Sequence, residues 1–290
     1  MGIADEAAVA GSTVLLIDAD VYGGVLAAAF GLLDESPGLA GACRMASNGR
    51  LDGPTLAGLC WSLGPRWSLL TGIARADRWP EVRPSAIPLV LAVARGLADV
   101  VVIDCAAILE TDEEISFDTM APRRNGATLA VLGEADVVIA VGAGDPPGIE
   151  RLVRGLAQLG EAVPQISPRV VVNRTRRSAA SRREIDDAIF RFTGLGVAAQ
   201  LPEDRDATDR AWRRCVGLSQ AAPRSALRAG LAGLTRGLVP PAPSSALLED
   251  PYAVVPRVDA TDQERPAVGV GADEVDDRRR RGRHKGTNPG

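Results

Sequence analysis

The stretch Val14-Leu-Leu-Ile-Asp18-Ala-Asp20-Val-Tyr-Gly23-Gly24 decides the fold class of this chain. An unbroken apolar run that ends in acidic and glycine residues predicts a buried strand followed by a turn. Ligands of open α/β sheets bind at the carboxyl ends of the strands. The stretch therefore predicts a strand that delivers two carboxylates to a binding site.

Further apolar runs alternate with segments of helical period, which predicts a parallel sheet with helices on its faces. The runs expected to form strands lie at 14–18, 67–71, 100–104, 137–141, 169–173 and 197–201. The segments expected to form helices lie at 87–97, 149–159, 185–192 and 219–238, with one more that begins at Pro122. The fold class is therefore α/β, a three-layer sandwich with a mostly parallel sheet. The β-branched runs at 100–104 and 136–141 are expected in the middle of that sheet.

The composition excludes several classes of function. With 290 residues, of which 46% are hydrophobic and 24% charged, the chain can bury a full core, and its net charge of -4 does not favour nucleic acid over the molecule as a whole. The four cysteines form no C-x-x-C pair, and the one histidine is His284. Catalytic triads and histidine- or cysteine-based metal sites are therefore not expected. No apolar run is long enough to span a membrane, and a reducing cytoplasm fits best.

The composition changes after Leu238, where prolines, serines and scattered charges replace the apolar period. We expect residues 1–238 to form one domain and residues 239–290 to be a disordered, Pro-rich and charged tail. The tail ends in acidic residues followed by the basic run Arg278–Arg281. A solvated tail is the simpler interpretation, and weak contact with DNA or anionic lipid is the alternative.

A second motif is Val100-Val-Val-Ile-Asp104, an apolar strand that ends in an acidic residue. Such an aspartate can hold a magnesium-bound water, although any α/β sheet can end a strand in aspartate. Paired with Asp18 and Asp20 on another strand, Asp104 indicates a shared site, because the carboxyl ends of parallel strands meet at one edge of a sheet.

A third motif is the apolar strand that ends in Asn173 and Arg174, followed further along the chain by Pro202 and Asp204. An asparagine amide offers both a donor and an acceptor, which an adenine edge requires. An asparagine after a strand is also a common turn residue. The arginines at 174–183 can meet phosphates of a nucleotide or of DNA, or they can form a solvated face.

In this order, the three motifs resemble the ParA/MinD group of deviant-Walker ATPases, most closely its actinobacterial CpaE-like and septum-site-determining-like members. The resemblance covers roughly residues 12–238. It implies a P-loop NTPase-like fold and a nucleotide-switch protein that binds ATP and Mg²⁺ and helps to position a septum, a pilus or a chromosome. It also implies a homodimer with cell-division, pilus-assembly or partitioning proteins as partners, in the cytoplasm or peripherally at the membrane or nucleoid.

The resemblance also assigns roles to individual residues. By it, Asp20 orients the attacking water in catalysis, and Asp104 holds the metal, Mg²⁺, through a water molecule. Asn173 contacts adenine together with the turn after the last strand. The residues that the resemblance places on this cofactor-binding side are Asn173, Arg174, Pro202 and Asp204.

The chain departs from this family where the phosphates should bind. A loop of the form G-x-x-x-x-G-K-[ST] and the strand before it are missing, and the one lysine is Lys285. The usual proline after the second motif is replaced by Cys105-Ala-Ala. We therefore expect the chain as written to be unable to hydrolyse ATP. We favour missing upstream sequence over a genuine non-hydrolysing relative, because losing a central strand leaves backbone groups unpaired.

Two other classes of function stay open. The first is a non-catalytic regulatory module that binds partners, which a measurement of ATP binding would separate from an ATPase. The second is an NAD-dependent oxidoreductase, suggested by Gly142, Gly144 and Gly148 after a strand. It is the weaker alternative, because this glycine spacing departs from the dinucleotide fingerprint and two prolines remove amide donors.

Overall fold

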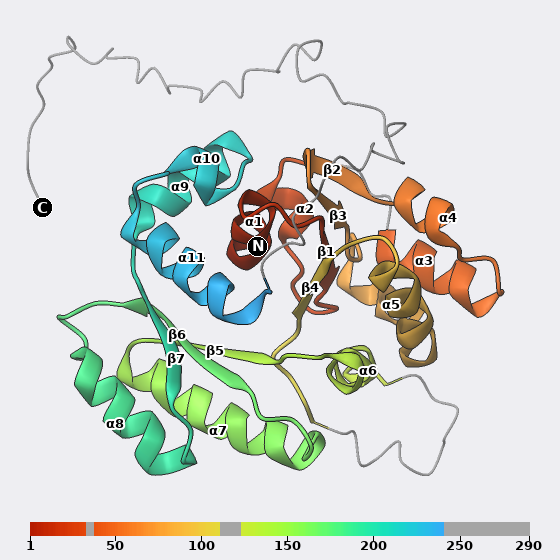
Figure 1. Ribbon diagram of the computed structural model, residues 1–290. Helices are drawn as coiled ribbons and strands as arrows, with labels where there is room; N and C mark the ends of the chain where they lie inside the picture. Colours follow the sequence, from red (N-terminus) through yellow and green to blue (C-terminus); the bar gives the residue numbers. More distant parts are fainter. Residues whose placement is uncertain (33–37, 111–122, 241–290) are drawn as a thin grey trace, which may run out of the picture. The chain divides into compact units, whose positions relative to one another are not determined.

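The computed structural model describes residues 1–32, 38–110 and 123–240, which form a layered α/β fold (Figure 1). The first sheet contains β1 (Val14–Ala19), β2 (Trp61–Gly64), β3 (Trp67–Leu70) and β4 (Val100–Cys105), in the order β2-β3-β1-β4. The second contains β5 (Ile139–Ala143), β6 (Arg169–Thr175) and β7 (Val197–Pro202), in that order. Every pair is parallel except β2 with β3. The predicted α/β fold with mostly parallel strands is confirmed.

All six predicted strands are present close to their expected bounds. The strand β2 was not predicted. It spans only four residues, pairs antiparallel with β3, and lies half-exposed at the edge of the sheet. So short a strand does not show the alternation of apolar and polar residues on which the prediction of strands depends.

The expectation that the runs at 100–104 and 136–141 lie in the middle of one sheet is wrong. Among the described residues, β4 and β5 each pair with a strand on one side only, at the edges of two different sheets. Their side chains are half-buried or exposed, and Val141 is 60% exposed. A run of β-branched residues indicates that the side chains pack well in a strand, but it does not indicate how many neighbouring strands the backbone pairs with. It therefore does not distinguish a central strand from an edge strand.

Helices cover both faces of the first sheet. The helices packed on one face are α3 (Gly38–Ser47), α5 (Ile87–Arg95) and α6 (Gly126–Glu134), and those on the other are α1 (Gly2–Val9) and α2 (Leu26–Ala29). Side chains alternate along β1, so Leu15 and Ile17 enter the first core and Val14 and Leu16 the second. The remaining short elements near this sheet are α4 (Gly53–Gly58), η1 (Ala76–Glu81) and η2 (Pro84–Ala86).

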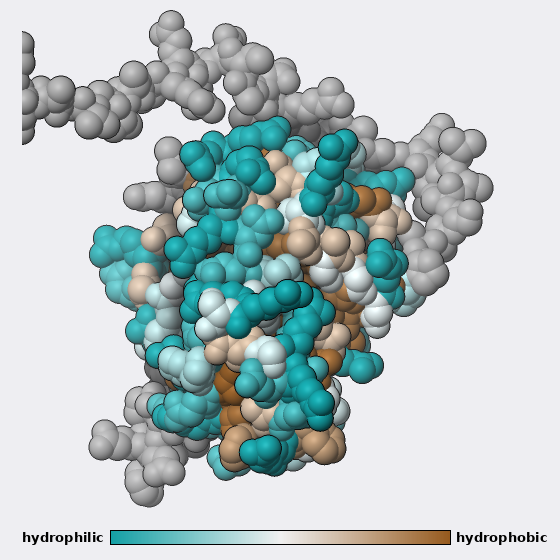
Figure 2. All heavy atoms as spheres, turned by 90° about the vertical axis from the view of Figure 1, so that its left-hand side faces the viewer, coloured by the Kyte–Doolittle hydropathy of each residue, from teal (hydrophilic) through white to brown (hydrophobic). Residues whose placement is uncertain are grey.

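The second sheet is covered in the same way. The helices on one face are α7 (Pro146–Ala162) and α8 (Arg182–Thr193), and those on the other are α9 (Arg205–Arg214), α10 (Leu218–Ala221) and α11 (Ala226–Leu238). Figure 2 looks onto the side of the molecule where α8 and α9 lie in Figure 1, and it shows a mainly hydrophilic surface. No helix among the described residues is long and apolar enough to cross a bilayer.

Two predicted helices begin or divide differently from the expectation. The segment expected as one helix at 219–238 is two, because Pro223 has no backbone N–H and Ser225 accepts the amides that open α11. Its leucines do pack in the core, as expected, with Leu227 and Leu234 buried. The helix expected from Pro122 begins at Gly126, and Pro122 itself lies outside the described residues.

The predicted tail cannot be compared with the fold. Apart from Val239 and Pro240, its residues lie outside the described part of the chain.

Two buried acidic residues tie α1 to the C-terminal helices. Asp5 accepts hydrogen bonds from the amide (2.8 Å) and the hydroxyl (2.5 Å) of Ser219, and Glu6 forms an ion pair of 2.8 Å with Arg228. Asp5 is 3% exposed and Glu6 5% exposed. Because α1 packs against β1 and α11 packs against β7, these contacts join the two halves of the fold.

We expect Arg228→Gln to lower the free energy of unfolding by about 3 kcal/mol, because it leaves the buried Glu6 carboxylate unpaired. The measurement is chemical denaturation. The control is Arg224→Gln, since Arg224 forms no ion pair with a described residue. Adding Glu6→Gln to Arg228→Gln should restore part of the loss, and an equal loss in both arginine variants would contradict the role of the pair.

Candidate functional site at the carboxyl ends of the strands

The parallel pairing of β1 with β4 brings the first two sequence motifs together. Asp18 lies opposite Asp104 in the register of the two strands, and Asp20 follows where β1 ends. Asp18 is buried at 2% exposure, Asp20 is half-buried and Asp104 is exposed. The three carboxylates therefore lie close together at one edge of the sheet.

Asp18 is the anchor of the turn that follows β1. Its Oδ1 accepts the amide of Asp20 at 3.2 Å, and its Oδ2 accepts the amide of Leu26 at 3.1 Å. These bonds fix both ends of the segment between β1 and α2. Sequence reasoning grouped Asp18 with the motif but gave it no role of its own.

Two glycines make the space that Asp18 occupies. A Cβ atom added at Gly24 would lie 2.6 Å from Asp18 Oδ1, and one added at Gly72 would lie 3.0 Å from Asp18 Cγ. Gly72 follows β3, far from the motif in the sequence, and no signal in the sequence joins it to Asp18. Only the pairing of β1 with β3 shows that both glycines serve one carboxylate.

Burial raises the pKa of Asp18 from its ordinary value of 3.8 to about 6. The two backbone hydrogen bonds to its carboxylate oppose this shift, and the charges of Asp104 and Asp20 add to it. The carboxyl group of Asp104 is crowded although the residue as a whole is exposed, and this desolvation raises its pKa too. The nearby amino group of Met1 opposes that rise, and the charge of Asp20 reinforces it.

Asp20 uses one carboxylate oxygen to shape its own turn. Its Oδ1 accepts the amides of Tyr22 at 2.8 Å and of Gly23 at 3.1 Å. This is the local pattern by which aspartate stabilises a turn. Its Oδ2 accepts no hydrogen bond from the described residues, so this oxygen is available to a ligand or a water molecule.

Gly24→Ala should lower the free energy of unfolding by about 2 kcal/mol, because the new methyl group overlaps the buried Asp18 carboxylate. Thermal and chemical unfolding measure this. Gly23→Ala is the matched control, since its Cβ would meet only Asp20 Oδ2 at 3.8 Å, an ordinary contact. Equal effects at the two glycines would show that the Asp18 pocket is not tightly packed.

Asp18→Asn should flatten the dependence of stability on pH. The folded pKa of Asp18, about 6, lies above its ordinary value of 3.8, so folding takes up a proton. Its stabilising contribution is complete below the ordinary value and is lost as the pH rises through about 6. Between about pH 5 and 7 the wild type should lose roughly 1 kcal/mol relative to Asp18→Asn in urea unfolding. Parallel curves for the two proteins would contradict the raised pKa.

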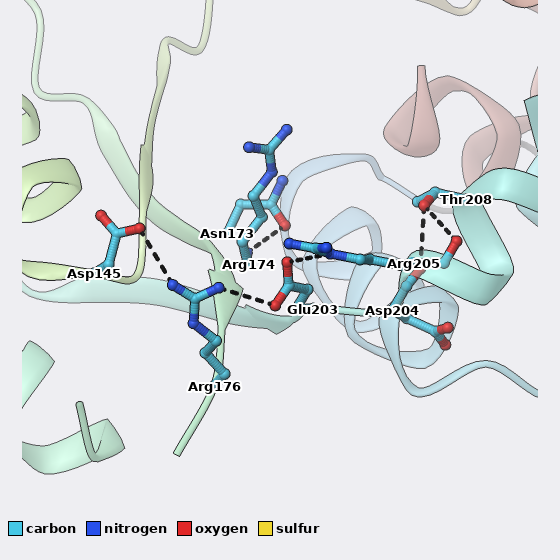
Figure 3. Close-up of polar contacts among 8 residues, drawn as sticks. All are labelled: Asp145, Asn173, Arg174, Arg176, Glu203, Asp204, Arg205 and Thr208. Carbon is cyan, nitrogen blue, oxygen red and sulfur yellow. Dashed lines mark hydrogen bonds and ion pairs between the residues drawn. The ribbon is translucent and has the colours of Figure 1, made fainter. Parts of the chain in front are cut away.

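The third motif lies at the carboxyl ends of β6 and β7 (Figure 3). Asn173 Oδ1 accepts a hydrogen bond from the backbone amide of Arg174 at 2.8 Å. The side-chain amide nitrogen of Asn173, Nδ2, donates to no described residue. Arg174 has a φ of 55°, a conformation that is rare for a side chain of this size and typical of functional or strained positions. Figure 3 shows its guanidinium pointing away from the neighbouring ion pairs.

Pro202 and Asp204 lie beside this motif but serve the fold. Pro202 ends β7 opposite Thr175 of β6. The Asp204 carboxylate accepts the hydroxyl of Ser225 at 2.7 Å and the amide of Ala207 at 3.0 Å, which caps α9. These hydrogen bonds lower the pKa of Asp204 and leave both oxygens engaged, so a ligand would meet the backbone of this turn.

Arg176 holds the ends of the second sheet together. It bridges Asp145, 3.6 Å away at the start of α7, and Glu203, 3.2 Å away after β7, and Arg205 joins Glu203 at 3.0 Å (Figure 3). Sequence reasoning saw Arg176 only as one of several clustered arginines. The acidic partners were not identifiable, because they follow two other strands.

The site consists of two groups that share no hydrogen bond or ion pair within the described residues. One holds Asp18, Asp20 and Asp104, and the other holds Asn173, Arg174 and the turn at 202–204. No three acidic, histidine or cysteine side chains of the described residues are placed to coordinate one metal ion directly.

The three glycines that suggested a dinucleotide loop have close packing roles. A Cβ added at Gly142 would lie 2.7 Å from Leu152, one at Gly144 would lie 2.9 Å from Thr175, and one at Gly148 would lie 2.5 Å from the Ala143 carbonyl oxygen. Gly142 and Gly148 let α7 approach β5, and Gly144 lets the chain after β5 approach the end of β6. The side chain of Asp145 caps this helix by accepting the amide of Gly148.

The layered fold, with carboxylates at the ends of adjacent parallel strands, is the fold of ParA- and MinD-type ATPases. The chain is 20% identical to a ParA family ATPase from Chlorobium tepidum over 81% of this chain and 92% of that one, with a TM-score of 0.65. It is 16% identical to the septum site-determining protein MinD of Pyrococcus horikoshii, solved with Mg-ADP, over 81% and 86% of the two chains, with a TM-score of 0.61.

A third similar structure is the ATP complex of Cyanothece McdA, 17% identical over 82% of this chain and 89% of that one, with a TM-score of 0.55. No protein-family model and no curated protein matches the sequence. At these identities the likeness shows the fold.

Proposed function

We propose that this protein is a nucleotide-switch protein of the ParA/MinD kind that helps to position a septum, a pilus or a chromosome. The observation that carries the proposal is the register of β1 and β4, which sets the Asp18–Asp20 turn beside Asp104 at the carboxyl edge of a sheet with this fold. That arrangement matches a cation site next to a residue that can orient water.

The residues of the first group fit a magnesium ion. Burial raises the pKa of Asp18 and of Asp104, and the negative charge of neighbouring carboxylates adds to each rise. A bound cation would offset this concentration of negative charge. Asp104 is exposed at the end of β4 and would hold the ion through water. Asp20 Oδ2 is the free oxygen beside it and is the candidate to orient a water molecule. A bound magnesium ion would supply positive charge against phosphate oxygens.

The residues of the second group fit the base of a nucleotide. The side-chain amide nitrogen of Asn173 donates to no described residue, so it is available to a ligand, and the exposed side chain of Arg174 follows it in the chain. Pro202 ends β7 and offers a backbone carbonyl at the same edge. We propose that these groups contact adenine, with Asp204 shaping the turn through its cap on α9.

We identify no loop among the described residues that fits the phosphates of ATP. Phosphate binding in such folds needs a nest of backbone amides at a helix N-terminus and a lysine, and the one lysine is Lys285. The arginines at 174–183 follow the base-side strand and do not replace a nest of amides. We therefore propose that residues 1–290 do not hydrolyse ATP.

Partners and location follow from the same proposal. The similar structures include a MinC:MinD cell division protein complex from Aquifex aeolicus. We propose a homodimer that binds cell-division, pilus-assembly or partitioning proteins in the cytoplasm, with the basic end of the tail as a weak contact for DNA or anionic lipid. The competing proposal is a regulatory module that binds partners without nucleotide, which the missing phosphate loop favours.

Calorimetric titration of residues 1–290 with Mg-ATP should show no saturable binding below millimolar concentration. The physical reason is the loss of several charge-assisted hydrogen bonds to the phosphates, each worth roughly 1.5–3 kcal/mol. A micromolar dissociation constant would overturn this part of the proposal and would mean that another loop binds the phosphates.

Millimolar Mg²⁺ alone should raise the melting temperature of the wild type, and Asp104→Asn should remove most of that rise, because the variant lacks the charge that holds the ion. Asp99→Asn is the matched control, because Asp99 precedes the same strand but binds Thr13 at the opposite end. An equal rise in melting temperature in Asp104→Asn and the wild type would contradict the proposed cation site.

A further inference from the structure

Tyr22 links the turn after β1 to the start of α6. Its hydroxyl donates to Asn125 Oδ1 at 2.6 Å, and its ring lies 3.8 Å below the guanidinium carbon of Arg124. Arg124 also donates to the carbonyl oxygen of Val21 at 3.0 Å. We name Tyr22, Arg124 and Asn125 the Tyr22 clamp.

Both polar atoms of the Asn125 side-chain amide form hydrogen bonds. It accepts from Tyr22 through Oδ1 and donates through Nδ2 to the carbonyl oxygen of Glu110 at 2.6 Å. The side chain is 8% exposed, so losing either partner leaves a polar group without water. This explains why Asn125 precedes α6 without capping it through its side chain. One residue thus fixes the chain leaving β4 and the helix that follows.

The same tyrosine is bound to Asp20 through its backbone. Asp20 Oδ1 accepts the Tyr22 amide at 2.8 Å, while the Tyr22 hydroxyl reaches Asn125. The Asp20 carboxylate is therefore connected to the residue before α6 through the backbone and the hydroxyl of Tyr22. An alanine or valine at position 22 would keep the turn bonds but not this connection.

We infer that Tyr22 and Asn125 are positioning residues that hold the Asp20 turn against the start of α6 and the chain leaving β4. The inference rests on the proposed role of Asp20. It goes beyond it by naming how the position of that carboxylate is set and where a change at the site is transmitted. Neither residue needs to touch a ligand.

Hydrogen exchange of the α6 amides from Leu129 to Leu132 tests the clamp without any ligand. In a background that keeps Tyr22, Asp20→Ala should speed this exchange about fivefold, which corresponds to the loss of one net hydrogen bond. In a Tyr22→Phe background the same substitution should add little, because the hydrogen bond from the Tyr22 hydroxyl to Asn125 is already lost. Asp52→Ala is the control, since Asp52 accepts the Thr55 amide in the same local way at α4.

The exchange rates distinguish a specific connection between Asp20 and α6 from a general loosening of the fold. A speed-up by Asp20→Ala that is as large with Tyr22→Phe as without it would overturn the inference, and so would no speed-up in the wild type. Failure of Mg²⁺ to stabilise the protein would instead count against the proposed function, so the two failures are distinguishable.

A second variant guards against misfolding of Tyr22→Phe. Asn125→Asp keeps an acceptor for the Tyr22 hydroxyl and loses the donor to Glu110. The fluorine signal of fluorotyrosine-labelled Tyr22, read in a Tyr252→Phe background, should then stay near its wild-type position. In Asn125→Leu, which has no acceptor, the signal should move, and an unmoved signal in Asn125→Leu would overturn the hydrogen bond on which the clamp depends.

Discussion

The parallel pairing of β1 with β4 is the interaction on which the rest of the site depends. It places Asp18 opposite Asp104, and the buried Asp18 carboxylate then sets the course of the chain toward α2. Burying this carboxylate is costly, as its raised pKa shows, and two backbone amides only partly offset that cost. In return, the two oxygens of Asp18 hold both ends of the turn that carries Asp20.

The two halves of the fold are joined by side-chain contacts and not by strand pairing. α1 lies against the first sheet and binds the C-terminal helices through Asp5 and Glu6, both buried. β4 and β5 contribute no backbone pairing to this joint within the described residues. Leu132 of α6 also packs in one apolar cluster with Leu159 of α7. The two halves are therefore held together by α1 with its two acidic side chains and by this apolar cluster.

The functional proposal separates what the site can hold from what it cannot. Carboxylates at adjacent strand ends suit a hydrated cation, and the Asn173 amide suits a base edge. The one lysine of the chain, Lys285, lies outside the described residues. The fold of ParA- and MinD-type ATPases is thus present, and the two groups proposed to contact a cation and a base lie at the ends of its strands. The Tyr22 clamp adds a route by which the Asp20 turn is held in place.

The sequence by itself determined the α/β class, the six parallel strands and the clustering of Asp20 with Asp104, because hydrophobic period and strand ends are local signals. It also marked Asn173 and Arg174 at a strand end, where the structure places them. Only the tertiary structure decided that β4 and β5 are edge strands, since pairing depends on which backbones meet. It likewise decided that Asp204 is a helix cap, that Gly72 makes room for Asp18, and that Tyr22 meets Asn125. Each of these contacts joins residues far apart in the chain, and side-chain type alone carries no information about such a partner.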